Sequence, residues 1–225
     1  MNRPLLGLLH RRECLLPTRR GWLALIIAAT LALVGLGAGA YPFLAVQDSV
    51  PGGVLIAEGW LPDYGLKEAL AEFRSGSYSG LYVSGIPLDQ GAILSEYRTF
   101  AELSAAVLLK FGADPQTLHA VPAPPVAQDR TFSTALALRD YLQSHGVRAE
   151  KVNIVSLGAH SRRTRLLYEK AFGPGVRVGI IAVPHRDFDP ARWWRSSQGV
   201  RVVIDEIIAY LYGRCLFHPK VTPPA

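Results

Sequence analysis

The chain has 225 residues, enough for one domain and a short appendage. It carries 24 Lys and Arg residues against 18 Asp and Glu residues, a formal net charge of +6, but this charge is unevenly distributed. The first twenty residues hold five arginines against Glu13, whereas residues 48–225 hold nineteen basic and seventeen acidic side chains. The basic character therefore belongs to the N-terminal tail, and we expect no nucleic-acid partner, which would need a basic stripe on the folded domain itself.

A long apolar segment follows this tail. Residues 21–47 contain no charged side chain, and residues 22–46 are mostly Leu, Ala, Ile and Val. A helix needs about 20 such residues to cross a bilayer. Because arginines precede the segment and Asp48 follows it, the positive-inside rule predicts a single-pass protein of the inner (cytoplasmic) membrane with a cytoplasmic N-terminus and an extracytoplasmic domain. The small residues Ala38, Gly39 and Ala40 also fit signal-peptide cleavage, which is the alternative.

These features divide the chain into five parts. We predict a basic cytoplasmic tail at residues 1–20, a transmembrane anchor at 21–46, a linker at 47–53, an α/β domain at 54–217 and a C-terminal tail at 218–225. Cys14 and Cys215 fall on opposite sides of the predicted anchor, so they cannot form a disulfide. No Cys-based zinc motif, His-Glu-x-x-His motif or Walker glycine loop occurs, so we expect no metal site of these kinds, and the sequence leaves the cofactor and the oligomeric state open.

Strand and helix patterns alternate after the linker. Apolar runs predict buried strands at residues 54–57, 81–83, 118–121, 152–157 and 176–183. Amphipathic patterns predict helices at residues 63–75, 95–111, 130–145, 161–171 and 200–211. This alternation predicts an α/β fold in which a mainly parallel five-stranded sheet is covered by helices on both faces.

The central stretch of this pattern is residues 152–168, VNIVSLGAHSRRTRLLY. A predicted strand meets a turn at Gly158, and a helix follows. Ser161 occupies the predicted N-cap, so the free amides of the first helical turn would face the turn and permit an anion site. The helix dipole disfavours cations in this first turn by roughly 0.3–1 kcal/mol each, so we expect acidic partners for the arginines there, which are Arg162, Arg163 and Arg165.

Ligands of parallel sheets bind outside the carboxyl ends of the strands. Most polar and aromatic candidates of this chain fall at that edge. We predict that the site contains Glu58, Trp60, Ser84, Gly85, Arg130, Thr131, His160, Arg162, Arg163 and Trp194.

His160 and Glu58 are the candidates for catalysis. The imidazole of His160 titrates near working pH and can exchange a proton with a leaving oxygen, and Glu58 would supply a carboxylate opposite it. Either side chain can instead be a helix cap or a structural support. Ser84 is expected to form hydrogen bonds rather than to act as a nucleophile, because no Gly-x-Ser-x-Gly elbow surrounds it.

The remaining candidates would bind the ligand. Arg163 can clamp a phosphate or carboxylate with its planar fork of donors, or it can form a salt bridge with Asp205 or Glu206. Trp60 and Trp194 would hold a sugar ring or rest on the membrane surface. Asp129, Asp187 and Asp189 offer oxygen ligands for a divalent cation, but their spacing does not require one.

Four short motifs resemble those of the YdcF/SanA/ElyC family of bacterial envelope proteins over about residues 53–212. They are Val83-Ser84-Gly85, Glu96, Arg130-Thr131 with Ala135, and His160-Ser161-Arg162-Arg163, which matches the family's His-x-x-Arg. The chain departs from the family at Glu58-Gly59-Trp60, where a glycine-rich turn is usual, and at residues 131–135, where the family has Thr-x-Glu-Asn-Ala. The resemblance implies a three-layer Rossmann-like fold, an envelope location and a role in cell-wall or surface-polysaccharide metabolism.

Three functions remain open from these observations. The first is a membrane-anchored hydrolase or transferase that acts on a phosphate-bearing or acidic glycan, or on a lipid-linked precursor. The second is a non-catalytic envelope module that binds such a ligand with the same residues. The third is a nucleotide-binding or methyl-donor-binding protein, which would require the domain to lie in the cytoplasm.

Overall fold

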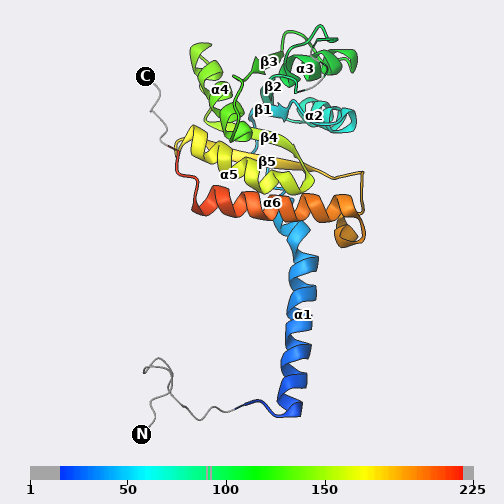
Figure 1. Cartoon of the computed structure of the whole chain (residues 1–225). Coiled ribbons are helices and arrows are strands. Elements are labelled where there is room, and N and C mark those ends of the chain that lie inside the picture. The colour runs from blue at the N-terminus through cyan, green and yellow to red at the C-terminus, as the bar shows by residue number, and fades with distance from the viewer. Residues whose placement is uncertain (1–15, 90, 92, 220–225) are drawn as a thin grey trace. The chain divides into compact units, whose positions relative to one another are not determined.

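The computed structural model of the chain describes residues 16–89, 91 and 93–219 (Figure 1). Most of the predicted basic tail, including Cys14, lies outside these residues, as do residues 220–225 of the predicted C-terminal tail. The chain divides into two compact units, Met1–Gly37 and Ala38–Ala225.

The first described element is the apolar helix α1 (Arg19–Leu44). Its most apolar 18-residue window has a mean hydropathy of 2.3, and none of that window is buried within the protein. The helix is therefore long and apolar enough to cross a membrane, as a signal sequence near an N-terminus also is.

The last residues of α1, from Ala38 to Leu44, belong to the second unit. Tyr41 and Leu44 are buried there against Ala159, Phe188 and Val203. The helix thus ends inside the packing of the α/β domain, two residues before the predicted end of the anchor.

Five parallel strands form one sheet in the order β3-β2-β1-β4-β5, which confirms the predicted fold class. The strands are β1 (Gly53–Glu58), β2 (Tyr78–Gly85), β3 (Leu118–Pro122), β4 (Lys151–Leu157) and β5 (Arg177–Val183). Residues Val54–Ala57 are buried on both faces of the sheet, which explains why this run is continuously apolar rather than alternating.

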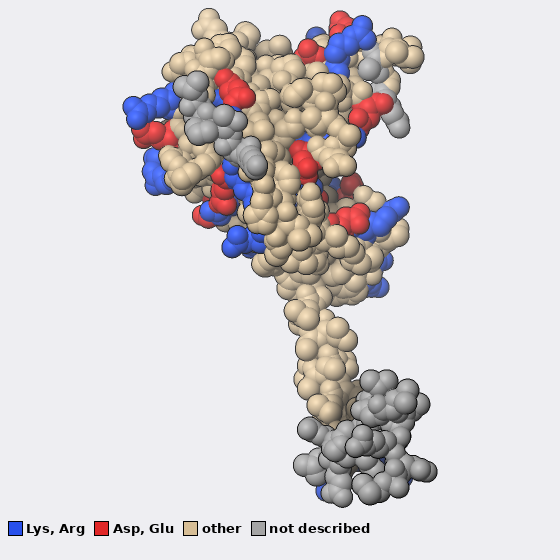
Figure 2. Space-filling model, turned by 60° about the vertical axis from the view of Figure 1, so that its left-hand side comes forward, with Lys and Arg blue, Asp and Glu red and all other residues tan. Residues whose placement is uncertain are grey.

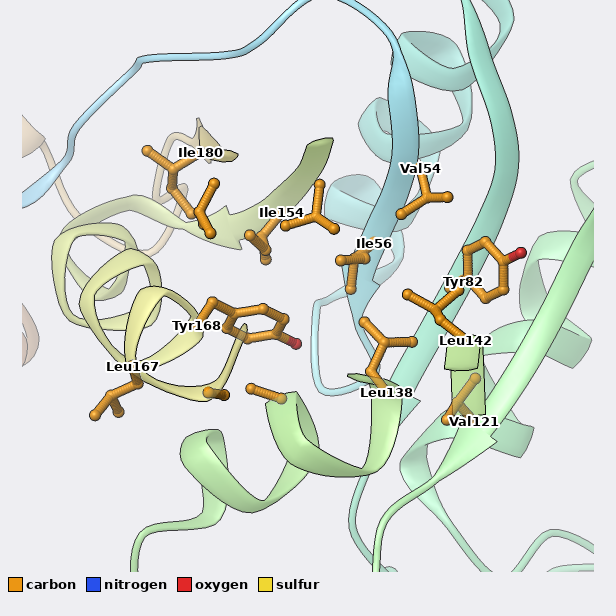
Figure 3. Close-up of a cluster of buried hydrophobic side chains, with 14 of the residues drawn as sticks. Val54, Ile56, Tyr82, Val121, Leu138, Leu142, Ile154, Leu167, Tyr168 and Ile180 are labelled. Carbon is orange, nitrogen blue, oxygen red and sulfur yellow. The ribbon is translucent and has the colours of Figure 1, made fainter. Parts of the chain in front are cut away.

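Helices cover both faces of the sheet, giving three layers. On one face, Leu55 and Ala57 of β1 pack beneath α2 (Asp63–Ser75) and α3 (Phe100–Lys110). On the other face, Val54 and Ile56 join the side chains of α4 (Arg130–Ser144) and α5 (Ser161–Phe172), which Figure 3 shows as Leu138, Leu142, Leu167 and Tyr168.

Three further elements complete the second unit. Helix α6 (Ser197–Cys215) packs against α5 and against the short 3-10 helices η2 (Gly158–His160) and η3 (Pro190–Arg195). In the view of Figure 2, Lys and Arg side chains (blue) are interspersed with Asp and Glu side chains (red) over this unit. This face therefore carries no basic stripe of the kind that nucleic-acid binding needs.

The helix predicted at residues 95–111 begins only at Phe100. Thr99 is its N-cap: the Thr99 hydroxyl accepts a hydrogen bond from the amide of Glu102, and the Glu102 carboxylate accepts one from the amide of Thr99. This reciprocal capping box fixes the first turn, so residues 95–98 stay outside the helix.

The predicted linker is hydrogen-bonded to strands β4 and β5 of the sheet. Asp48 exchanges two backbone hydrogen bonds of 2.9 Å with Ile180 of β5. The buried Asn153 of β4 accepts a hydrogen bond from the amide of Val50 at 2.7 Å and donates to the carbonyls of Val50 and Gly52 at 2.8 and 3.1 Å. These bonds leave the chain little freedom between α1 and β1.

The strand order reverses between β1 and β4, because the chain runs outward from β1 to β3 and then returns to the other side of β1. Such a reversal leaves a crevice outside the carboxyl ends of the two central strands. Glu58 ends β1 and Gly158 follows β4, so both border this crevice.

We predict that Asn153→Ala destabilises the protein by about 2–4 kcal/mol, since three partly buried hydrogen bonds are lost and the backbone groups of Val50 and Gly52 lose their partner. Thermal unfolding of the full-length protein in detergent measures the loss. The exposed Gln116→Ala is the matched control and should melt like the wild type. Equal melting temperatures for the two variants would show that Asn153 does not fasten this segment.

Candidate functional site

A cavity of about 570 Å³ opens at the carboxyl ends of the central strands. It is bordered by the ends of β1 and β2, the N-terminus of α4, the start of α5 and the C-terminal half of α6. Eight of the ten residues predicted from the sequence line it: Glu58, Trp60, Ser84, Gly85, Arg130, Thr131, His160 and Arg163.

Arg162 and Trp194 lie elsewhere. Successive residues of a helix point about 100° apart, so Arg162 faces away from its neighbour Arg163. Arg162 donates a hydrogen bond to the carbonyl of Phe43, and its guanidinium lies 4.0 Å from the centre of the Phe43 ring. Trp194 lies in η3, and 48% of the residue is exposed. Neither side chain borders the cavity, so the structure does not bring Arg162 and Trp194 together with the other eight predicted residues.

Glu58 lies at the innermost part of the site. Only 3% of this residue is exposed, and its Oε1 accepts a hydrogen bond of 3.2 Å from the hydroxyl of Thr164. Its Oε2 is buried without a hydrogen-bond partner among the described residues. The Nε2 atom of His160 lies 3.6 Å from Oε1, beyond hydrogen-bond distance, and it too is buried without a partner. The two groups therefore face each other with unused hydrogen-bonding capacity.

Glu206 of α6 contacts the other ring nitrogen of His160, Nδ1. Its Oε1 lies 2.7 Å from Nδ1 of His160. Arg163 donates to both carboxylate oxygens, from Nε to Oε2 at 2.8 Å and from Nη2 to Oε1 at 3.0 Å. The structure thus contains the salt bridge that was the alternative to ligand clamping by Arg163.

The proton on His160 can be assigned from these contacts. Nδ1 lies within hydrogen-bond distance of Oε1 of Glu206 and also 2.9 Å from Nη2 of Arg163, and it cannot both donate and accept. A lone pair on Nδ1 would face the carboxylate and repel it. Nδ1–H therefore donates to Glu206, and the contact with Arg163 is not a hydrogen bond.

The surrounding charges set the protonation of this group. Burial lowers the pKa of His160, but the carboxylates of Glu58 and Glu206 outweigh burial and raise the pKa to about 9. Burial raises the pKa of Glu206, but His160 and Arg163 outweigh it and lower the pKa to about 2. His160 is consequently an imidazolium at neutral pH, which corrects the expectation that it titrates near working pH.

The first turn of α5 does not offer the predicted anion site. Ser161 is the first residue of α5 and not its N-cap, because η2 runs directly into the helix and the amide of Ser161 bonds to the carbonyl of Gly158. The Ser161 side chain is buried, and its hydroxyl has no partner among the described residues. The predicted N-cap is therefore wrong.

The N-terminus of α4 also borders the cavity. Asp129 precedes it in the left-handed region, at φ 54°, and makes no capping hydrogen bond with its side chain. Arg130 and Thr131 line the cavity in the first turn, where backbone amides lack helical acceptors. Arg130 pairs with Asp89 at 2.9 Å, and both side chains are 53% exposed, so a ligand can compete for the guanidinium.

Ser84, Gly85 and Trp60 shape the rest of the cavity. The hydroxyls of Ser84 and Tyr168 lie 3.1 Å apart, in agreement with a hydrogen-bonding role for Ser84. A side chain at Gly85 would meet the backbone of Ala101 at 2.5 Å, so glycine is needed there for packing. The rings of Trp60 and His160 are nearly perpendicular, with their centres 4.9 Å apart. Trp60 is 41% exposed, so part of its ring is free to contact a ligand.

Three residues of the site were missed from the sequence: Glu206 as part of the site itself, Thr164 and Tyr168. Glu206 had a detectable signal, because it shares the buried face of α6 with Val203 and Tyr210 at helical spacing. A carboxylate on an otherwise apolar face needs a cationic partner. Thr164 and Tyr168 gave no such signal, since both also fit an ordinary core.

Within the described residues, no group of three or more His, Cys, Asp or Glu side chains could hold a metal ion. Asp187 and Asp189, which were considered as ligands, do not border the cavity with Asp129.

Comparison with known proteins adds no assignment: no protein-family model and no curated protein sequence matches the chain. The resemblance to the YdcF/SanA/ElyC family stays a prediction from the quoted motifs.

We predict that Arg163→Ala destabilises the protein by roughly 3–5 kcal/mol, because it leaves Glu206, whose side chain is only 13% exposed, without its bidentate partner. Arg165→Ala, two residues further along α5, removes more exposed pairs with Asp48 and Glu169 and should cost less than about 1 kcal/mol. Thermal unfolding of both variants gives the comparison. Similar melting temperatures would contradict a structural role for Arg163.

The raised pKa of His160 predicts how stability depends on pH. The folded state holds this proton more tightly than the unfolded state, so the contribution is complete below the ordinary value of 6.5 and is lost as the pH rises through about 9. The melting temperature of the wild type should exceed that of His160→Gln most below pH 6.5. The difference should shrink by several degrees towards pH 9, since about 1 kcal/mol shifts melting by roughly 2–4 °C in a domain of this size. A difference in melting temperature between the two proteins that stays constant from below pH 6.5 to pH 9 would show that His160 is not held protonated.

Proposed function

We propose that this protein is a membrane-anchored hydrolase or transferase of the cell envelope that acts on a phosphate-bearing or acidic glycan or on a glycolipid precursor. The observation that carries the proposal is the pair of Glu58 and His160 at the edge of the cavity: His160 Nε2 lies 3.6 Å from Glu58 Oε1, and Nε2 and the other carboxylate oxygen, Oε2, are both buried without a partner among the described residues. A buried carboxylate and a buried imidazolium without full hydrogen bonding are costly to keep, and such groups concentrate at functional sites.

The pair suits proton transfer in both directions. Glu58 Oε2 would take the proton of an attacking water or substrate hydroxyl as its oxygen bonds to the reacting phosphorus or sugar carbon. His160 would give its Nε2 proton to the oxygen that leaves, and Glu206 would stabilise the imidazole throughout through Nδ1. The proton taken by Glu58 then returns to His160 through solvent, which restores both groups.

The ligand class follows from the walls of the cavity. The first turn of α4 and the exposed guanidinium of Arg130 would bind an anionic group such as a phosphate. The partly exposed ring of Trp60 would contact the apolar face of a sugar. The resemblance to envelope proteins supports the same substrate class.

The location follows from helix α1 and the charges beside it. Arginines precede the apolar segment, so we place the N-terminus in the cytoplasm and the domain on the outer side of the inner membrane. A reporter fused after Ala225 that is active only in the cytoplasm would contradict this orientation and favour a nucleotide-binding or methyl-donor-binding protein.

The catalytic proposal predicts that Glu58→Gln lowers kcat by about 10²–10⁴-fold on lipid-linked sugar phosphates, because the amide cannot accept the proton. The change keeps the shape of the side chain, so KM should change little. Glu150→Gln is the matched control, since Glu150 is exposed and pairs only loosely with Arg148 at 3.7 Å. Full activity of Glu58→Gln would remove Glu58 from the reaction.

Saturable binding of these ligands without any product would instead indicate a non-catalytic module. The salt bridge between Arg163 and Glu206 is compatible with that reading, since it holds the site rigid without a ligand.

A further inference from the structure

Helix α6 carries an uncovered apolar stripe. Ile204, Ile208 and Leu211 follow one another at helical spacing and share one face, and they are 45%, 62% and 53% exposed. Exposed Cys215 lies one turn beyond Leu211 on the same face. Contiguous exposed apolar side chains of this kind mark a surface that contacts a protein or a membrane. We call these four residues the α6 stripe.

One flank of the stripe holds the end of helix α1. Val203 and Ile207 pack against Tyr41 and Leu44. Leu211 lies one turn beyond Ile207, at i+4, and therefore adjoins this flank.

The other flank of the stripe is the wall of the cavity. Ala209, Tyr212 and Gly213 line the cavity. Tyr212 lies at i+4 from Ile208 and is itself 45% exposed, so it connects the stripe to the cavity. The stripe thus separates the end of the apolar helix from the candidate site.

The length of the apolar helix leaves no spacer between a membrane and this surface. A spanning helix needs about 20 apolar residues. Twenty residues counted from Trp22 end at Tyr41, which is only 7% exposed, and Leu44 is fully buried in the domain. The domain cannot move away from the end of the span without pulling Leu44 out of its core.

The side chains around the stripe suit a lipid surface. Arg201 lies on α6 one turn before Ile204, and Arg192 and Arg195 lie on η3, which packs against α6. All three arginines are exposed, and they outnumber the exposed Asp205 that follows Ile204. Trp194 of η3 is 48% exposed, and tryptophan favours the interface between membrane and water. Arginines beside an apolar helical face attract anionic headgroups, whereas they would repel one another between two copies of the chain.

We propose that α6 lies along the bilayer surface with the α6 stripe inserted at the boundary of headgroups and acyl chains. This orientation places Tyr212 at the membrane surface, so the cavity opens beside the lipid headgroups. It rests on the membrane-spanning role proposed above for α1 and on the packing of α1 against α6, and it is independent of the catalytic proposal.

Depth-dependent fluorescence quenching tests this orientation in the full-length protein. Both native cysteines are replaced by Cys14→Ser and Cys215→Ser, and a single labelling site is introduced as Ile208→Cys or as the control Gln116→Cys. Gln116 is exposed on the loop between α3 and β3, across the sheet from α6. Each variant is labelled with an environment-sensitive dye and reconstituted into vesicles of phosphatidylcholine and phosphatidylglycerol that contain spin-labelled lipid.

We expect a blue-shifted emission and several-fold stronger quenching by spin-labelled lipid for Ile208→Cys than for Gln116→Cys. Equal, weak quenching at both positions would overturn the proposal. A blue-shifted but unquenched dye at Ile208→Cys, together with disulfide-linked dimers of the unlabelled variant, would also overturn it and assign the stripe to a second copy of the chain. Both positions are exposed, so neither substitution disturbs the core.

Discussion

The carboxylate of Glu206 joins the parts of the molecule that form the candidate site. It lies on the last helix, yet it binds His160 in the turn after β4 and Arg163 in the first turn of α5. Without this carboxylate, two cations would be buried together beside Glu58 alone. The pairing explains how Arg163 is tolerated where the helix dipole disfavours a cation, and it holds the imidazole by Nδ1 so that Nε2 faces Glu58.

Much of the fold was predictable because its strands are buried on both faces. A strand such as residues 54–57 must be apolar throughout when helices cover both sides of the sheet, and this run cannot be confused with a surface element. Helix ends were less predictable, because they depend on local hydrogen bonds. Thr99 and Glu102 start α3 later than its apolar pattern suggests, and a 3-10 turn removes Ser161 from the N-cap.

The candidate site was predictable where chain order alone decides position. Glu58, Ser84 and His160 each follow a strand, and the carboxyl ends of parallel strands share one edge. Side-chain direction was not available from the sequence, and the pairing of Arg163 with Glu206 could be named only as one of two alternatives. Arg162 and Arg163 are neighbours in the chain, but Arg162 contacts Phe43 whereas Arg163 contacts Glu206. Trp194 lies just before the N-terminus of α6, and only the C-terminal half of α6 borders the cavity.

The burial of Tyr41 also bears on how the chain is processed. The peptide bond after Ala40 lies within α1, and Tyr41 packs against the rings of His185 and Phe188. A peptidase acts on an extended strand, so the last turn and a half of the helix must open before this bond is cut. Cutting there would also create a new ammonium group among buried aromatic rings, which is unfavourable without a counter-charge. Folding of the domain would therefore compete with cleavage after Ala40, and a domain that folds first would keep α1 attached.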